Sequence, residues 1–280
     1  MNITFIGGGN MAQAIIGGLK ADGFNAADIG VVEPVAEQRT RLTAQFGVKV
    51  CATPAEAVPL GNMVVMAVKP QQMREAAAAV APHLASNALV LSIAAGIRID
   101  DLSRWLGGHA LVARCMPNTP ALIGAGMTAA CATASVSAAQ RADVDRVLAA
   151  MGKSIWVEKE ALLDPVTAIS GSGPAYVFYF IESLESSARE LGLAPADARL
   201  LALETFLGAA KLAASSTDDP ATLRAKVTSR GGTTEAALAS MEASGVKAAI
   251  ATATRAANAR SIELGEELGQ EPPGKAPGKD

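Results

Sequence analysis

The chain has 280 residues, of which 50% are hydrophobic and 18% are charged, with a formal net charge of −3. This balance is ordinary for a globular protein and lacks the basic excess of a nucleic-acid-binding surface. Three cysteines without a C-x-x-C spacing (Cys51, Cys115 and Cys131) favour a reduced, cytoplasmic setting. A strand over residues 2–6 leaves no room for a signal peptide, and the apolar stretches are shorter than the about 18 residues of a membrane-spanning helix. We therefore expect neither a leader nor a membrane span.

Short β-branched runs alternate with helical stretches through the first half of the chain. We expect strands at 3–6, 29–32, 48–51, 63–68, 89–93 and 111–115, with helices at 11–21, 36–46 and 71–83 between several of them. Two further strands, 127–131 and 155–157, flank a helix near 137–151. Alternation of this kind is typical of βαβ units, so the predicted fold class is α/β, with a mostly parallel, doubly wound sheet of the Rossmann type.

The pattern changes near residue 164, beyond which only helical periodicity is present. One helix opens at Gly173-Pro174 and ends at Gly192, another starts at Pro195, and two more cover 233–243 and 246–268. This part is too thin for a core of its own, so its apolar faces must be buried against the first domain or a second copy of the chain; we favour dimerisation. The expected divisions are a dinucleotide-binding domain (1–164), an all-helical dimerisation domain (165–269) and a disordered tail (270–280).

A glycine-rich turn follows the first expected strand and opens a helix. The segment fits G-x-G-x-x-A, in which Gly7 makes the tight turn, Gly9 lets the backbone approach a pyrophosphate and Ala12 lets the helix pack closely on the strand. Amides at the helix start then face the phosphates. The alternative, a glycine-rich loop that binds nothing, is disfavoured by the βαβ context. The expected cofactor-binding residues are Gly7, Gly8, Gly9, Asn10, Met11 and Ala12.

Glu33 ends the second expected strand, about 20 residues beyond this loop, where an acidic residue ordinarily bonds the adenine ribose and favours NAD over NADP. Arg39 and Arg41 on the following helix could instead reach a 2′-phosphate. Glu33 could also simply cap that helix, so the choice of cofactor stays open.

Two more loops follow strands, at the edge where open α/β sheets bind ligands. Their small residues and a proline-fixed turn suit backbone contact with a flat ring. Taken alone, Lys69 fits an ordinary surface lysine better. The further expected cofactor contacts are Ala67, Val68, Lys69, Pro70, Ala94, Ala95 and Gly96.

Three motifs are unusually rich in small and hydroxyl residues: MPNTP at 116–120, SGSGPA at 170–175 and SRGGTTE at 229–235. Each alone could be a turn followed by a helix cap, and Gly232 with Glu235 is similar to a variant capping box. In combination, they closely resemble pyrroline-5-carboxylate reductase. The resemblance runs from the first strand to about residue 268 and includes IGGGNMA, AVKPQ, LSIAAGI, MPNTPA, SGSGPAYVF and GGTTEAAL. Glu33, where the family more often has a small polar residue, and the tail depart from it.

The resemblance implies a Rossmann domain followed by an all-α domain whose helices interlock with those of a partner, giving a homodimer or a higher oligomer of dimers. The implied reaction is reduction of the cyclic imino acid 1-pyrroline-5-carboxylate to L-proline by hydride from NADPH, with NADH plausible. The substrate is a small molecule, and neither nucleic acid nor a membrane is an expected partner.

The resemblance implies that the third motif contains the catalytic residue and most of the substrate-binding residues. Thr234 is the candidate hydroxyl that hydrogen-bonds the ring nitrogen, although free threonine is too weak an acid to act unaided. The substrate carboxylate can sit on the amides of Gly231, Gly232 and Thr233 at a helix N-terminus. Weaker candidates are Ser229 and Ser170, which would line the substrate pocket, and Asn118, which would contact the nicotinamide side of the cofactor.

Two rival functions share the glycine loop. A β-hydroxyacid dehydrogenase of 6-phosphogluconate-like architecture would use a lysine of the helical domain, and Lys211, Lys226 and Lys247 are available, but none lies in a comparable motif. A non-catalytic dinucleotide sensor would have no reason to keep the GGTT segment.

The two histidines, His83 and His109, lie outside every motif and are expected at the surface or at helix ends. Their placement argues against a Ser-His-Asp hydrolase and against a metal site built on histidine or cysteine, so no metal is expected.

Overall fold

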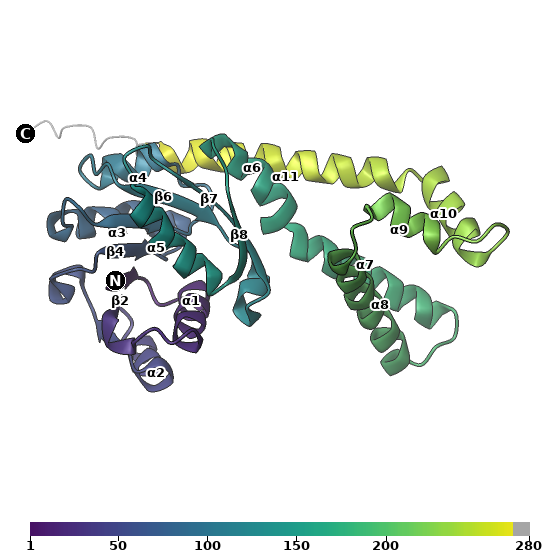
Figure 1. Cartoon of the computed structure of the whole chain (residues 1–280), viewed down its shortest axis with the longest axis horizontal. Coiled ribbons are helices and arrows are strands. Elements are labelled where there is room, and N and C mark those ends of the chain that lie inside the picture. Colours follow the sequence, from purple (N-terminus) through teal and green to yellow (C-terminus); the bar gives the residue numbers. More distant parts are fainter. Residues whose placement is uncertain (271–280) are drawn as a thin grey trace, which may run out of the picture. The chain divides into compact units, whose positions relative to one another are not determined.

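The computed structural model describes residues 1–270 (Figure 1), so the predicted tail lies outside the described residues except for Gln270. Its contacts divide the chain into two compact units, and each is described by itself. The first unit contains residues 1–172 together with residues 257–270, and the second contains residues 173–256.

One eight-stranded sheet forms the centre of the first unit. Its strand order is β3-β2-β1-β4-β5-β6-β7-β8. Neighbouring strands are parallel except for β6 and β7, which are antiparallel. The first six strands follow the Rossmann order, with its ligand-binding switch point between β1 and β4. The strands are β1 (Ile3–Ile6), β2 (Ile29–Val32), β3 (Lys49–Cys51), β4 (Met63–Met66), β5 (Leu89–Ser92), β6 (Val112–Met116), β7 (Gly126–Ala132) and β8 (Gly152–Trp156).

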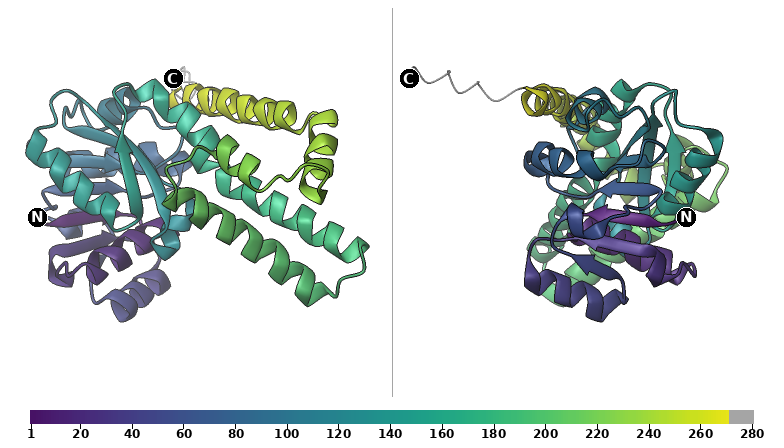
Figure 2. Two further views of the ribbon diagram at one scale, coloured as in Figure 1. Left: turned by 45° about the vertical axis from the view of Figure 1, so that its right-hand side comes forward. Right: turned by 90° about the vertical axis from the view of Figure 1, so that its left-hand side faces the viewer.

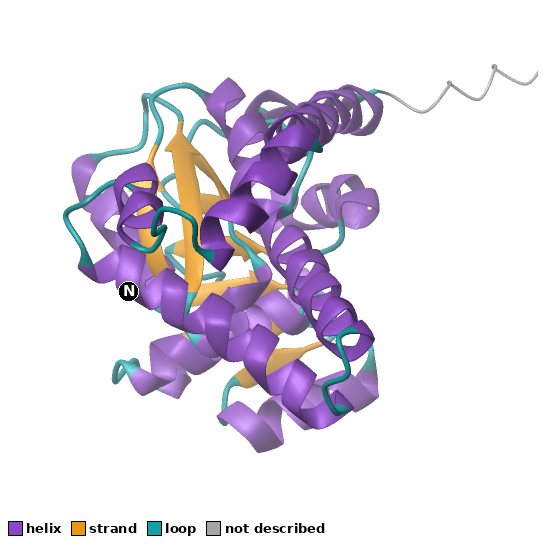
Figure 3. Ribbon diagram, turned by 90° about the vertical axis from the view of Figure 1, so that its right-hand side faces the viewer, coloured by secondary structure: helices purple, strands orange, loops and turns teal. Residues whose placement is uncertain are grey.

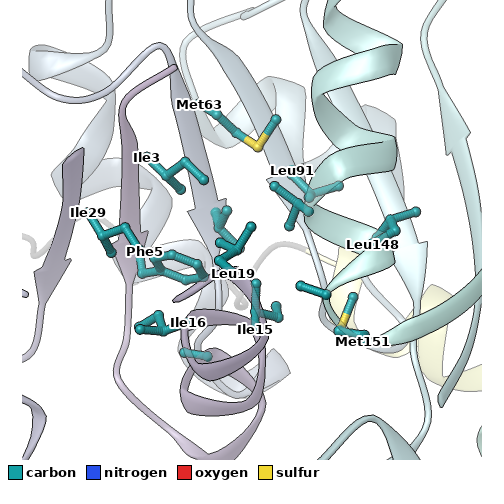
Figure 4. Close-up of a cluster of buried hydrophobic side chains, with 14 of the residues drawn as sticks. Ile3, Phe5, Ile15, Ile16, Leu19, Ile29, Met63, Leu91, Leu148 and Met151 are labelled. Atoms are coloured by element: carbon teal, nitrogen blue, oxygen red, sulfur yellow. The ribbon is translucent and has the colours of Figure 1, made fainter. Parts of the chain in front are cut away.

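Helices cover both faces of this sheet (Figure 3). Successive strand residues face opposite sides, so Phe5 packs into one core and Ile6 into the other. Figure 4 shows the first core, where Ile15 and Ile16 of α1 meet Phe5. The helices of that face are α1 (Asn10–Ala21), α2 (Ala36–Phe46) and α5 (Ala138–Ala149), and those of the other face are α3 (Met73–Val80), α4 (Ile99–Trp105) and α6 (Leu163–Val166).

Short helical turns join these elements. A π-helical turn, η7 (Thr167–Gly171), lies just before the chain passes into the second unit. The 3₁₀ turns are η1 (Ala26–Asp28), η2 (Pro54–Ala57), η3 (Pro70–Gln72), η4 (Ala81–His83), η5 (Thr119–Ile123) and η6 (Glu160–Leu162).

The second unit is entirely helical and has almost no interior. Its first two helices form a hairpin (Figure 2), in which the Phe180 and Phe206 rings stack with centroids 6.5 Å apart. The only buried residues of this hairpin are Ala198 and Ala202. The prediction that this part lacks a core of its own is confirmed. Its helices are α7 (Gly173–Glu190), α8 (Pro195–Ser215), α9 (Pro220–Lys226), α10 (Thr233–Ala243) and the first part of α11 (Val246–Gly269).

The end of α11 packs on the first unit beside α4 and α6 (Figure 1). The Ser261 hydroxyl donates to a carboxylate oxygen of buried Asp164 at 2.7 Å, and Arg98 donates to the other oxygen at 3.0 Å. Gly265 lies against the Arg98 guanidinium, where a Cβ would come within 2.7 Å of Nε. The sequence places the domain boundary at residue 164 and assigns the last helix wholly to the second domain. The contacts put the division after Ser172 and share α11 between the units, because this polar anchor and the packing of Leu268 hold its end on the first unit.

Among the described residues, no helix is both long and apolar enough to span a lipid bilayer.

Candidate active site

The glycine-rich loop lies at the carboxyl end of β1, at the switch point of the sheet. Gly7 has a φ of +100°, and its N–H donates to the Val32 carbonyl at 2.8 Å. A Cβ on Gly7 would lie 2.7 Å from the carbonyl oxygen of Ala67 in the loop after β4. Both the backbone conformation and this close approach therefore require glycine at position 7.

The start of α1 is open in the way that a bound phosphate requires. Gly9 is the N-cap residue, it provides no side-chain cap, and the first turn of the helix contains no acidic residue. A Cβ on Gly9 would meet no atom within 4 Å, so the protein itself does not require glycine there. Free first-turn N–H groups and the helix dipole favour an anion at this point. These features fit the pyrophosphate of a dinucleotide cofactor.

Glu33 turns its carboxylate back onto the glycine loop. One carboxylate oxygen accepts from the Gly8 N–H at 3.0 Å, the other accepts from the Val35 N–H at 3.0 Å, and the residue is only 9% exposed. On the far side of the same loop, the side-chain amides of Gln13 and Gln38 donate to the Gly8 carbonyl at 2.9 and 3.0 Å. Glu33 therefore helps to fix the conformation of the glycine loop, a role called framing below.

The two arginines that could reach a 2′-phosphate already have partners. Arg39 donates to the carbonyls of Glu33 and Pro34 at 2.7 and 2.8 Å, and Arg41 pairs with Glu37 at 2.5 Å. Arg39 thus lies at the end of β2 beside the predicted adenine side of the cofactor, whereas Arg41 lies on the exposed surface of α2.

The other two predicted loops lie at the same edge of the sheet. The Ala67 N–H donates to the Ile6 carbonyl at 2.8 Å, which ties the loop after β4 to β1, and Lys69 is exposed at the start of η3. In the loop after β5, Gly96 has a φ of +75°, and a Cβ there would lie 3.0 Å from Cδ1 of Leu268. The end of α11 therefore forms the wall behind this loop, a contact that sequence reasoning missed.

Asn118 joins two of the motifs. Its side-chain oxygen accepts from the Met127 N–H at 2.9 Å, and its NH₂ group donates to the carbonyl and the hydroxyl oxygen of Ser170, each at 3.2 Å. Ser170 belongs to the π-helical turn, and such turns occur frequently at functional sites. Gly171 of the same turn lies against the side chain of Met116. The predicted nicotinamide-side residue and the predicted pocket serine are thus in direct contact.

The GGTT segment forms a tight loop and the start of α10 in the second unit. Gly231 has a φ of +72°, and its N–H donates to the Glu235 carboxylate at 2.6 Å. The Gly232 N–H donates to the Ser229 carbonyl at 3.1 Å, and Gly232 is an N-cap without a side-chain cap. Within residues 1–270, the hydroxyl of Thr234 makes no hydrogen bond, and the first-turn amides of α10 have no acceptor.

The comparisons with known proteins cover both units. Residues 2–96 match the family described as NADP oxidoreductase coenzyme F420-dependent, and residues 160–264 match pyrroline-5-carboxylate reductase dimerisation. A pyrroline-5-carboxylate reductase of Pseudomonas aeruginosa is 48% identical over 96% of this chain and 98% of its own length. The chain belongs to the pyrroline-5-carboxylate reductase family.

Solved structures agree with this assignment. A pyrroline-5-carboxylate reductase from Coxiella burnetii is 36% identical with a TM-score of 0.89, covering 94% of this chain and 98% of that one. The Plasmodium falciparum enzyme with NADP bound is 28% identical with a TM-score of 0.84, covering 95% and 98%. The resemblance, the fold class, the enzyme class and NAD(P)H as the cofactor are confirmed, and the chain carries the dimerisation domain of a homodimer.

Membership of the pyrroline-5-carboxylate reductase family sets aside both rival functions. The lysines that a hydroxyacid dehydrogenase would need are also otherwise engaged or exposed. Lys226 pairs with Asp218, Lys247 pairs with Glu242 at 2.6 Å, and Lys211 is exposed on α8.

The structure brings the predicted cofactor residues to one edge of the sheet, and it places Ser229 to Thr234 in the loop before α10 and the first turn of that helix. The His109 Nε2 contacts the Ala88 carbonyl at 2.7 Å, and His83 ends η4, with both residues partly exposed. Within residues 1–270, no group of three His, Cys, Asp or Glu side chains is arranged to hold a metal ion. Sequence reasoning missed the engagement of Glu235 with Gly231, although the variant capping box of Gly232 and Glu235 indicated a contact of this kind.

Proposed function

We propose that the chain reduces 1-pyrroline-5-carboxylate to L-proline with NADPH or NADH. The observation that carries this proposal, beyond the family itself, is the open N-terminus of α10 with the unpartnered hydroxyl of Thr234 beside it. A helix start attracts a carboxylate, and a neighbouring hydroxyl can form a hydrogen bond with a ring nitrogen.

The first unit holds the cofactor in this proposal. The amides that follow Gly9 bind the pyrophosphate, and the loops after β4 and β5 lie against the nucleotide. When bound, the reduced nicotinamide supplies the hydride. Asn118 and the turn that contains Ser170 support its nicotinamide side.

The second unit holds the substrate carboxylate. Because the Gly231 and Gly232 N–H groups are already donated within the loop, the free donors are the amides of Thr233 and Thr234 in the first turn. Gly231 and Gly232 then shape the turn that exposes these amides, and Ser229 holds the turn through its carbonyl.

Thr234 acts on the ring nitrogen. In the substrate, the carbon that carries the carboxylate is bonded directly to that nitrogen, so a hydroxyl next to the carboxylate-binding amides comes within reach of it. As the new C–H bond forms, the π electron pair of the C=N bond moves to nitrogen, which must hold a proton. Where the imine is already protonated, its N–H donates to the Thr234 hydroxyl, which orients the ring. Where the imine is neutral, its nitrogen accepts from that hydroxyl and takes its proton from solvent. Most of the acceleration then comes from positioning.

Thr234→Ala tests this role, with Thr234→Ser as the variant that keeps the hydroxyl. We expect kcat/KM for the imine to fall roughly 10- to 100-fold in the alanine variant, the value of one hydrogen bond to a charged group such as the protonated imine. The serine variant should recover most of the activity, and the affinity for NADPH alone should not change. Unchanged kcat/KM in Thr234→Ala would remove the proposed role.

Two finer properties accompany this function. The three free thiols of Cys51, Cys115 and Cys131 support a reduced, cytoplasmic setting.

Residues Val177 to Phe180 are consecutive and exposed, so apolar side chains lie on every side of α7. More than one apolar face supports assembly of the dimers into a higher oligomer, which light scattering of the purified protein would measure.

A further inference from the structure

Glu235 makes an unusual cap at the start of α10. In a capping box, the acidic residue at the third helical position accepts from the N–H of the N-cap residue. Here the N-cap is Gly232, and its N–H is already donated to the Ser229 carbonyl at 3.1 Å. The Glu235 carboxylate instead reaches one residue further back and accepts from the Gly231 N–H at 2.6 Å.

This contact puts an anionic group on the loop that presents the anion-binding amides. Within residues 1–270, Glu235 forms no ion pair: Lys226 pairs with Asp218 and Lys247 with Glu242, and Arg230 is exposed and forms none with it. Its negative charge is therefore not offset by a cation in direct contact. An incoming carboxylate meets both the free amides of Thr233 and Thr234 and the repulsion of a carboxylate held on the same turn.

We infer that Glu235 sets how tightly this site binds carboxylates, by holding one loop donor and opposing a second negative charge. The inference rests on the proposed function, because it takes α10 as the carboxylate site. The product carries the same carboxylate as the substrate, so Glu235 weakens the binding of both. Weaker binding of the product keeps it from accumulating on the enzyme.

Glu235→Gln tests the effect of the negative charge separately from that of the hydrogen bond that shapes the loop. The glutamine oxygen still accepts from the Gly231 N–H, so the loop keeps its cap while the charge is removed. We expect the KM for the imine and the inhibition constant of L-proline each to fall roughly three- to tenfold, the effect of removing a nearby like charge in a wet site. The affinity for NADPH alone should be unchanged. The difference from wild type should shrink at high salt, because exposed charges are screened.

Glu242→Gln is the matched control, since it makes the same charge change near the other end of the same helix, where Glu242 pairs with Lys247 at 2.6 Å. It should leave the KM for the imine unchanged. Should Glu235→Gln fail to fold, as judged by its circular dichroism, Glu235→Ala takes its place with the same expected fall.

An unchanged or increased KM in the folded Glu235 variant would overturn the inference. Wild-type enzyme that turns over the imine alongside such a result would leave the proposed function intact. Wild-type enzyme that does not reduce the imine would overturn the proposed function itself.

Discussion

Replacing Glu33 with glutamine tests whether this residue frames the glycine loop or selects the cofactor. Both carboxylate oxygens accept backbone N–H groups, from Gly8 and Val35, each at 3.0 Å. Glutamine offers one acceptor oxygen for these two donors, and its NH₂ group would face the second N–H. Loss of one buried hydrogen bond to a charged group costs about 1.5–3 kcal/mol. Because the loop must regain its shape to bind a dinucleotide, kcat/KM should fall roughly 10- to 100-fold for NADPH and NADH alike.

The assay is the initial rate with each reduced cofactor at saturating imine, for wild type and Glu33→Gln. Glu37→Gln is the control, because it removes an equal charge from a side chain that is 75% exposed on the next helix. Loss of about 2 kcal/mol should also lower Tm by roughly 4–8 °C for a unit of this size. A rise in kcat/KM for NADPH with a fall for NADH would refute the framing role, since it would show the Glu33 charge acting on the ribose end of the cofactor.

Three further perturbations test neighbouring parts of the account. Gly9→Ala should leave Tm unchanged, because a Cβ meets no atom within 4 Å, and should weaken cofactor binding roughly tenfold in a fluorescence titration; equal affinity would contradict the pyrophosphate placement. Burial raises the pKa of the Cys115 thiol to about 12, and burial together with the Glu56 charge raises that of Cys51. Since only the thiolate reacts, alkylation at pH 8 should be slow at both and should accelerate as pH rises; labelling of Cys115 at the rate of free cysteine would contradict its burial. Ser261→Ala should lower the unfolding free energy of the first unit by about 1–2 kcal/mol in a urea titration, and no loss would show that its bond to Asp164 does not anchor α11.

Much of the fold follows from local sequence signals. Strands β1 and β2 are β-branched and lie in the buried centre of the sheet, so their hydrophobic runs predict them directly. Position 7 requires glycine because its φ is positive, and the glycine-rich motif already predicts a tight turn there. These features depend on residues close together in the chain, which is why the pattern reveals them.

The short helix α4 could not be predicted in the same way. Its N-cap residue, Arg98, makes no side-chain cap, and the Ile99 N–H donates instead to the Glu160 carboxylate at 2.8 Å, far along the chain. The same carboxylate pairs at 2.7 Å with Arg114, which is 1% exposed in the middle of β6. The first N–H of the helix and one guanidinium nitrogen of the buried arginine thus both bond to a residue of η6, and no local pattern contains that information.

In the candidate site, too, some features follow from local sequence and others depend on contacts that the sequence does not reveal. Sequence places Glu33 at the end of a strand and Gly231 and Thr234 at the start of a helix, where the structure also has them, because strand ends and helix starts are local features. It does not show that Glu33 turns inward to the glycine loop or that Glu235 occupies the Gly231 amide. Those directions depend on which donors remain free after the neighbouring turns have formed their own hydrogen bonds.

The most direct test of the central claim measures cofactor oxidised and L-proline formed when the purified chain is given 1-pyrroline-5-carboxylate and NADPH. The account predicts that reduced-cofactor absorbance falls only when the imine is present, and that the two amounts are equal. Absence of turnover with both NADPH and NADH, or oxidation of cofactor without L-proline, would contradict it.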